Sequence, residues 1–176
     1  MHIFLILVIA VSLSMDAFSL SLAYGTLNLE RKNVIQLATI VGIYHFVMPL
    51  LGNSFGHLLL KFIPVRPELI VFLVLTIIGI QMIIESFKKE TEVKQMNFFE
   101  LLAFGLAVSM DSFSVGIGIQ AISSHYIISS LLFSISSFIF TYLGLQLGKK
   151  LSTIFGKAAT LLGGITLIAI GIVYMY

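Results

Sequence analysis

The chain has 176 residues, of which 59% are hydrophobic and 10% are charged, and its formal net charge is +2 at pH 7. A soluble domain of this size carries far more charge, so the composition excludes that class and indicates a membrane protein. The absence of cysteine excludes disulfides and thiolate metal sites, and no basic run interleaved with aromatics suggests nucleic-acid binding.

Six apolar runs approach the ~20 residues that an α-helix needs to cross a bilayer core. They cover residues 3–24, 34–60, 68–87, 98–120, 126–147 and 158–176. The first run lacks a basic leader and a small-residue cleavage pattern, so we expect a spanning helix rather than a removed signal peptide. The polar breaks at 28–33, 61–68, 88–97, 123–125 and 148–157 are expected to be loops. These features predict an all-α polytopic membrane protein with six transmembrane helices.

Basic residues are distributed unequally between the two sides of this predicted arrangement. Only two of the ten Lys and Arg residues, Lys61 and Arg66, fall on one side. The other eight share the opposite side: Arg31, Lys32, Lys88, Lys89, Lys94, Lys149, Lys150 and Lys157. Because basic loops stay in the cytoplasm, both termini are expected outside it.

The two halves of the chain resemble each other. The stretch SMDAFSLS from Ser14 matches SMDSFSVG from Ser109, and LGNSFG from Leu51 matches LGLQLG from Leu143. Each half holds three predicted spans, and an odd number forces the second copy into the membrane upside down. We therefore expect two inverted three-helix repeats, at 1–87 and 98–176, joined by a charged cytoplasmic linker at 88–97. The G-x-x-x-G spacing of both second helices is typical of close helix packing.

The matched stretches each carry an intramembrane carboxylate, Asp16 and Asp111. A charge at the bilayer centre costs at least ~2.5 kcal/mol, so such groups usually face a partner, a cavity or an ion path. Every Lys and Arg lies in a loop or at a span end, which leaves a proton or an exogenous metal cation to neutralise them. Because the two helices run in opposite directions, both carboxylates are expected near the midplane, where one site could hold both.

Several oxygen and nitrogen donors accompany the carboxylates. Ser12 and Ser19 share a helix face with Asp16, and Ser114 shares one with Asp111. Carboxylate and hydroxyl oxygens suit Mg²⁺, Ca²⁺ or Mn²⁺. The predicted metal-binding set is Asp16, Asp111, Ser12, Ser19, Ser114, His45 and Asn53.

Four of the polar residues have ordinary alternative explanations. His45, just before Pro49, is either a ligand or proton acceptor or a buried histidine bonded to a neighbouring helix. Asn53 is equally well explained by an interhelical hydrogen bond. Glu85 and Glu100 form ion pairs with nearby lysines, or else line a cytoplasmic mouth that collects cations.

With these residues in view, the chain resembles the MntP-type manganese efflux pumps of bacterial inner membranes, within the broader lysine-exporter-like superfamily. The resemblance rests on the doubled Ser-Met-Asp motif, MPLLG from Met48, GIQMIIESF from Gly79 and LLGGITLIAIGI from Leu161. It implies export of Mn²⁺ from the cytoplasm, with transport depending on Asp16 and Asp111. The position of His45 is usually Gln or Glu in that family, so no role is carried over to it.

The main hypothesis is a secondary transporter that exports Mn²⁺, driven by proton antiport, with no cofactor and a possible homodimeric state. The P-loop pattern of ATP-driven pumps is missing from the sequence. The alternatives are an exporter of another divalent cation or of a small organic cation or amino acid, an intramembrane hydrolase, and a structural membrane protein. A hydrolase is disfavoured because the sequence lacks H-E-x-x-H, and its match to G-x-S-x-G, GNSFG from Gly52, lies inside the predicted span 34–60 rather than between a strand and a helix.

Overall fold

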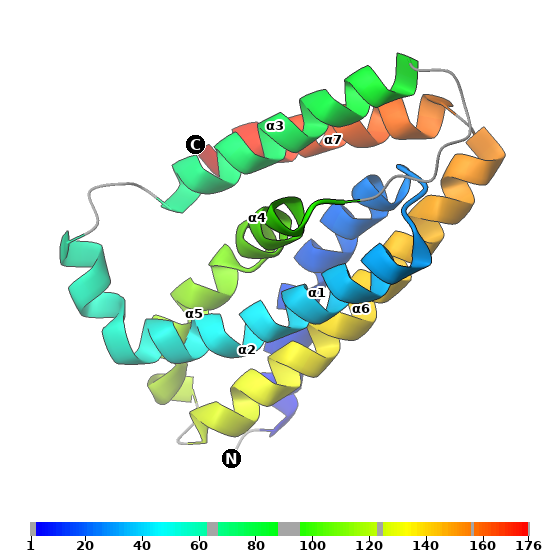
Figure 1. Cartoon of the computed structure of the whole chain (residues 1–176). Coiled ribbons are helices and arrows are strands. Elements are labelled where there is room, and N and C mark those ends of the chain that lie inside the picture. The colour runs from blue at the N-terminus through cyan, green and yellow to red at the C-terminus, as the bar shows by residue number, and fades with distance from the viewer. Residues whose placement is uncertain (1–2, 63–66, 88–95, 123–124, 156, 176) are drawn as a thin grey trace.

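A computed structural model describes residues 3–62, 67–87, 96–122, 125–155 and 157–175 (Figure 1). The described part of the chain contains seven helices and no strand, so the all-α prediction is confirmed there. The helices are α1 (Ile3–Gly25), α2 (Arg31–Phe62), α3 (Pro67–Phe87), α4 (Phe98–Val108), α5 (Met110–Ile122), α6 (Tyr126–Phe155) and α7 (Lys157–Met175).

The helix boundaries differ from the predicted ones in two places. The fourth predicted span is two helices, α4 and α5, which meet at Ser109 with a bend of 42°. The loop predicted at 148–157 is wrong over most of its length, because α6 continues to Phe155. Lys149, Lys150 and Leu151 are good helix formers, and Gly148 packs directly on Leu22 of α1, which holds this part of α6 in place. The predicted loop residues 63–66, 88–95 and 123–124 lie outside the described residues.

Length and hydropathy support a membrane location. Three stretches are long and apolar enough to cross a bilayer, namely Ile6–Gly25, Arg31–Ser54 and Tyr126–Ile154, and the bent α4–α5 pair makes a fourth if counted as one span. Within α3 and α7, the described apolar stretches Leu75–Ile84 and Thr160–Val173 are shorter. Large hydrophobic side chains remain exposed along all the long helices, as is expected of surfaces that face lipid. The chain is a helical, multi-pass membrane protein.

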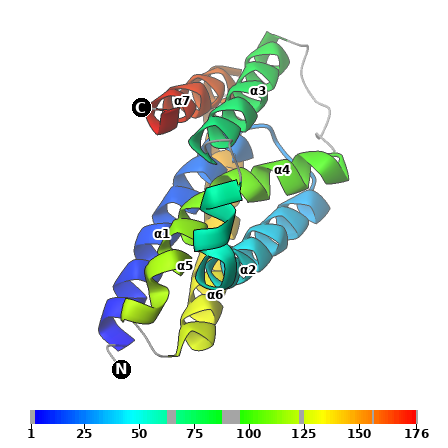
Figure 2. The same cartoon turned by 90° about the vertical axis from the view of Figure 1, so that its left-hand side faces the viewer.

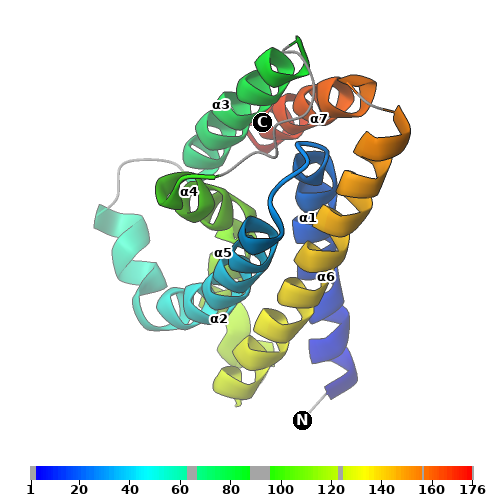
Figure 3. The same cartoon turned by 45° about the vertical axis from the view of Figure 1, so that its right-hand side comes forward.

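The helices pack in pairs drawn from opposite ends of the chain. The most extensive contacts join α1 to α6, α3 to α7, α2 to α6 and α2 to α5. Figure 1 shows α3 and α7 side by side across one end of the molecule, and Figure 3 shows α1 running along α6. By contrast, α1 and α5 touch only weakly, although they run beside each other in Figure 2. Among the described helices, the closely packed pairs α1–α6 and α2–α5 are thus joined by a similarly extensive α2–α6 contact, and α3 and α7 form a further pair.

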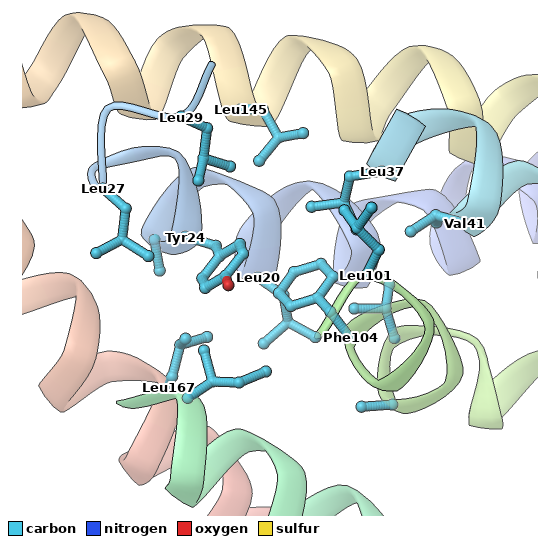
Figure 4. Close-up of a cluster of buried hydrophobic side chains, with 14 of the residues drawn as sticks. Leu20, Tyr24, Leu27, Leu29, Leu37, Val41, Leu101, Phe104, Leu145 and Leu167 are labelled. Carbon is cyan, nitrogen blue, oxygen red and sulfur yellow. The ribbon is translucent and has the colours of Figure 1, made fainter. Parts of the chain in front are cut away.

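The main hydrophobic core lies where α1, α2, α4 and α7 converge (Figure 4). At its centre the ring of Tyr24 stacks on that of Phe104, with centroids 4.7 Å apart and an interplanar angle of 21°. Leu37 and Leu101 pack around this stack, and both are buried. Stacked aromatic pairs add about 0.5–1.5 kcal/mol beyond their burial. This layer fixes α1 against α4 on one side of the two aspartates.

Candidate functional site

The helix break at Ser109 positions Asp111. The Ser109 amide donates to the carbonyl oxygens of Gly105 (3.2 Å) and Leu106 (3.3 Å), and its Oγ donates to Gly105 O at 2.7 Å. Hydroxyl groups that bond back to the preceding turn bend helices. Helix α4 ends at Val108, and Asp111 occupies the first turn of α5, where amide groups lack intrahelical partners and favour a negative charge.

Only one of the two oxygens of the Asp111 carboxylate accepts a hydrogen bond from the described residues. Its Oδ1 accepts a hydrogen bond from the Ser112 amide at 2.7 Å and a longer one from Ser112 Oγ at 3.4 Å. Its Oδ2 is buried and has no hydrogen-bond partner among the described residues. A buried acceptor without a partner is costly, so this oxygen is available to a proton or a cation.

Asp16 faces the same region from α1. Its side chain is exposed, and it lies close enough to Asp111 for the two carboxylates to interact electrostatically. Neither carboxylate forms an ion pair within the described part of the chain. The Lys and Arg residues of that part lie toward the helix ends. Two carboxylates without a basic partner thus approach each other where α1 and α5 are loosely packed (Figure 2).

The three serines predicted as ligands lie on the same helices as the carboxylates but form no hydrogen bond with them among the described residues. Ser12, Ser19 and Ser114 are all exposed. Ser19 Oγ donates to the carbonyl oxygen of Met15 at 2.9 Å, which is ordinary bonding within a helix. Asn53 is half-buried. Each of these oxygens therefore lacks a link to Asp16 or Asp111 in this arrangement of the described residues.

His45 is completely buried in α2. Its Nδ1 lies 2.9 Å from the carbonyl oxygen of Val41, and because a carbonyl only accepts, Nδ1 carries the proton. The other ring nitrogen, Nε2, is buried without a partner in the described residues. Pro49, four residues later in the same helix, has no N–H to donate to the His45 carbonyl. His45 therefore offers one unpartnered acceptor, Nε2, among the described residues, and its carbonyl oxygen lacks the usual donor four residues later.

These groups do not form a closed metal cage. Among the described residues, no set of three or more His, Cys, Asp or Glu side chains is close enough to hold a metal ion. His45 is thus not gathered with the two aspartates in this structure. The arrangement supplies two carboxylates and leaves the remaining ligands to serines, main-chain oxygens or water.

Two serines beside the aspartates were not among the predicted ligands. Ser14 belongs to the doubled Ser-Met-Asp motif, whereas Ser112 follows its second copy, where the first copy has Ala17. Ser14 Oγ donates to Ala10 O at 2.6 Å and lies within hydrogen-bond distance of Ser136 Oγ, at 2.7 Å, which ties α1 to α6. Ser112 bonds Asp111 directly. Their position next to the Met-Asp pair of each copy was the available signal, whereas the spacing of a regular helix points to residues three or four positions from each aspartate.

Small residues bring the helices around the aspartates into close contact. A Cβ added at Gly144 in α6 would lie 2.7 Å from the carbonyl oxygen of Phe18 in α1. A Cβ added at Gly52 in α2 would meet the carbonyl oxygen of Phe113 in α5. Real Cβ atoms essentially never approach so closely, so only glycine fits at these two crossings. The expectation that the G-x-x-x-G spacing marks close packing is confirmed at both positions.

Comparison with known proteins assigns the family. The chain matches the family described as "Putative manganese efflux pump" over residues 28–175. Proteins described as manganese efflux pumps of the MntP type are similar along nearly the whole chain. One from Bacillus pumilus is 37% identical over 96% of this chain and 92% of its own length, and one from Methanobrevibacter smithii is 35% identical over 95% and 93%. One from Shouchella clausii is 32% identical over 99% and 98%.

No solved structure matches the chain. The family resemblance read from the doubled motif is confirmed, and the relatives' names describe transporters rather than enzymes. The chain belongs to the MntP-type manganese efflux pump family.

Proposed function

We propose that the chain exports Mn²⁺ from the cytoplasm across the bacterial inner membrane by exchange for protons, at a site built on Asp16 and Asp111. The observation that carries the proposal is the approach of two membrane-embedded carboxylates from separate helices, with no ion-pair partner in the described part of the chain. The relatives' names supply the ion. Carboxylate, hydroxyl and carbonyl oxygens suit Mn²⁺.

The inverted-repeat organisation is part of the proposal, with 1–87 and 98–176 as the two halves around the linker at 88–97. Adding 95 to the residue numbers of α1 gives α4–α5, and adding 92 to those of α2 gives α6. When the two halves are matched in this way, Phe18 corresponds to Phe113 and Gly144 corresponds to Gly52. The contact of Gly144 with Phe18 therefore predicts the contact of Gly52 with Phe113.

A second pair of contacts supports the same exchange. The bond from Ser14 Oγ to Ala10 O in α1 corresponds to the bond from Ser109 Oγ to Gly105 O in α4. Matching the two halves turns the α1–α6 pair into the α5–α2 pair. It exchanges the two members within the α3–α7 pair and within the α2–α6 pair, so these two pairs are unchanged. This is the pattern expected of two halves related by an axis in the membrane plane.

Proton coupling follows from competition at the carboxylates. Two carboxylates close together hold either protons or a divalent cation, since each neutralises the pair. Mn²⁺ entering from the cytoplasm displaces protons, and protons returning from outside displace Mn²⁺. The α1–α6 and α2–α5 pairs would rock about their shared α2–α6 contact, which would open and close the weakly packed side where α1 meets α5. One chain contains both carboxylates, so the mechanism does not require a homodimer.

The proposed orientation places both termini outside the cytoplasm, as the distribution of Lys and Arg predicts. Arg31, Lys32 and Lys150 are exposed at one end of the described helices, which would then be the cytoplasmic end. His45 is an additional candidate ligand that a movement of the helices would have to bring to the two aspartates, because its Nε2 has no partner in the described residues.

Purified protein in liposomes tests the proposal. With Mn²⁺ outside and an imposed proton gradient, wild type should move Mn²⁺ and dissipate the gradient in step. Asp16→Asn and Asp111→Asn should abolish both fluxes, whereas Thr166→Val, on an exposed position of α7, should not. Mn²⁺ movement without any proton flux would reject antiport, and equal Mn²⁺ flux in wild type and the aspartate variants would reject the site. Transport of an organic cation in place of metal would favour the alternative substrate.

A further inference from the structure

We infer that Glu100, Tyr24 and Asn33 form a second, weaker site for a hard divalent cation, which receives the ion before it reaches the two aspartates. This inference rests on the proposed function, since it concerns the path to the same midplane site. The three side chains come from α4, α1 and α2, which converge at the main core.

Each of the three residues has a buried polar atom without a partner. Tyr24 is 1% exposed and Asn33 is 5% exposed. The hydroxyl oxygen of Tyr24, Nδ2 of Asn33 and Oε2 of Glu100 are all buried, and none has a hydrogen-bond partner among the described residues. Buried polar groups in proteins are nearly always satisfied, so three such atoms on neighbouring elements indicate a ligand.

The three side chains lie at the same level of the bundle. Glu100 is one helical turn before Phe104, whose ring stacks on Tyr24, and Tyr24 and Glu100 are close enough to interact electrostatically. Asn33 is one turn before Leu37, which belongs to the same core cluster as Tyr24 and Phe104 (Figure 4). Side chains one turn apart share a helix face.

The chemistry of the cluster favours a cation over a water molecule alone. Water satisfies a hydroxyl or an amide, but an ionised carboxylate removed from water needs positive charge nearby. Lys149 donates to the carbonyl oxygen of Leu29 at 3.3 Å, and Glu100 has no ion pair within the described residues. Carboxylate, phenol and, after rotation of the Asn33 amide, carbonyl oxygens are ligands for hard divalent ions.

The cluster is separate from the midplane site. Glu100 precedes Asp111 by 11 residues, or roughly 16 Å at 1.5 Å per residue. Phe104 and Val108 lie between them along the chain, and both are buried. The Tyr24–Phe104 stack therefore divides the two sites, and it must open for an ion to pass. A site with a single carboxylate binds loosely enough to release its ion inward, as a path with several successive sites requires.

Hydrogen bonds at the end of α1 stabilise the position of Tyr24. The α1–α2 connection turns at Asn28, which has a positive φ of 53°. Thr160 Oγ1 of α7 donates to the Thr26 carbonyl at 2.9 Å, and Thr26 Oγ1 donates to Ala23 O at 2.7 Å. The end of α1 that carries Tyr24 is thereby fastened to α7 as well as to α4.

Counting bound Mn²⁺ tests the inference without relying on transport. The purified chain is titrated with Mn²⁺, and the free ion is measured by its electron paramagnetic resonance signal. We expect about two ions per wild-type chain, and one for the double variant Asp16→Asn, Asp111→Asn. Adding Glu100→Gln to that double variant should remove the last ion. Glu30→Gln is the matched control, because it removes the same charge from a partly exposed glutamate and should leave both ions bound.

Transport kinetics provide a second measurement. Glu100→Gln should raise the KM for Mn²⁺ about tenfold or more while kcat changes little, whereas Asp16→Asn should abolish transport. Tyr24→Phe keeps the ring stack and removes only the hydroxyl, so it should raise KM less and serves as the test if Glu100→Gln does not insert. A Glu100→Gln protein that binds two ions with wild-type KM would overturn the inference while leaving the proposed export intact. If wild type does not transport Mn²⁺ but the double variant still binds one ion through Glu100, the export proposal fails and this site stands.

Discussion

Replacing Gly144 with alanine should destabilise the protein measurably. The added Cβ would lie 2.7 Å from the carbonyl oxygen of Phe18, and ordinary contact begins at 3.4 Å. The α1 and α6 backbones must therefore separate by about 0.7 Å. Overpacking of this kind costs typically 1–3 kcal/mol, against a gain of about 1 kcal/mol from the better helix propensity of alanine. The net loss is up to about 2 kcal/mol, which corresponds to a fall in Tm of about 8 °C or less for a chain of this length.

Gly171 in α7 provides the matched control for this prediction. A Cβ there would lie 3.3 Å from Leu75 Cβ and 3.4 Å from the Phe72 carbonyl oxygen, which is close to ordinary contact. Gly171→Ala should therefore leave the Tm unchanged or raise it slightly. Both variants can be compared in detergent by thermal unfolding, with Gly52→Ala expected to behave as Gly144→Ala does. If Gly144→Ala melts as high as Gly171→Ala, the close approach of α1 and α6 is not what the structure indicates.

Three further substitutions have expected outcomes. Ser109→Ala removes the hydroxyl that bonds back to α4, so it should lower the Mn²⁺ transport rate by straightening the helix at Asp111, and an unchanged rate would mean that the bend does not position the carboxylate. Thr160→Val removes the bond to Thr26, and at about 0.5–1.5 kcal/mol for a hydrogen bond it should lower the Tm by a few degrees, while Thr166→Val on the exposed side should not. His45→Phe should reduce the apparent affinity for Mn²⁺ in binding titrations more than His45→Gln, which retains an acceptor; equal affinities in the two variants would remove His45 from the ligand set.

Much of the helical organisation was predictable because hydrophobic length is a local property of the sequence. The predicted run at 68–87 matches α3 within a residue, and the first run matches α1 equally well. The break at Ser109 was not predictable in this way, since neither Gly nor Pro marks it, and the matching Ser14 makes the same bond to the preceding turn inside the unbroken helix α1. The end of α6 was also missed, because Lys149 and Lys150 look like loop residues until the packing of the neighbouring Gly148 on α1 is seen.

The candidate site was predictable only in part. Asp16 and Asp111 stand out because a carboxylate in an apolar span is unusual, and the repeat pairs them. The neighbouring donors were less predictable: helix spacing favours Ser114, whereas the bend makes Ser112 the hydrogen-bond donor to Asp111. The proximity of Tyr24 to Glu100 could not be read from the sequence, because 76 residues separate them and only the packing of α1 on α4 brings them together.

The most direct test of the central claim measures the manganese content of bacteria that lack their own manganese exporter. Cells producing wild type should contain less manganese and tolerate more of it in the medium, with magnesium unchanged. Cells producing Asp16→Asn or Asp111→Asn at the same level in the membrane should match cells without the protein. Equal manganese content in cells with wild type and with either aspartate variant would contradict the account.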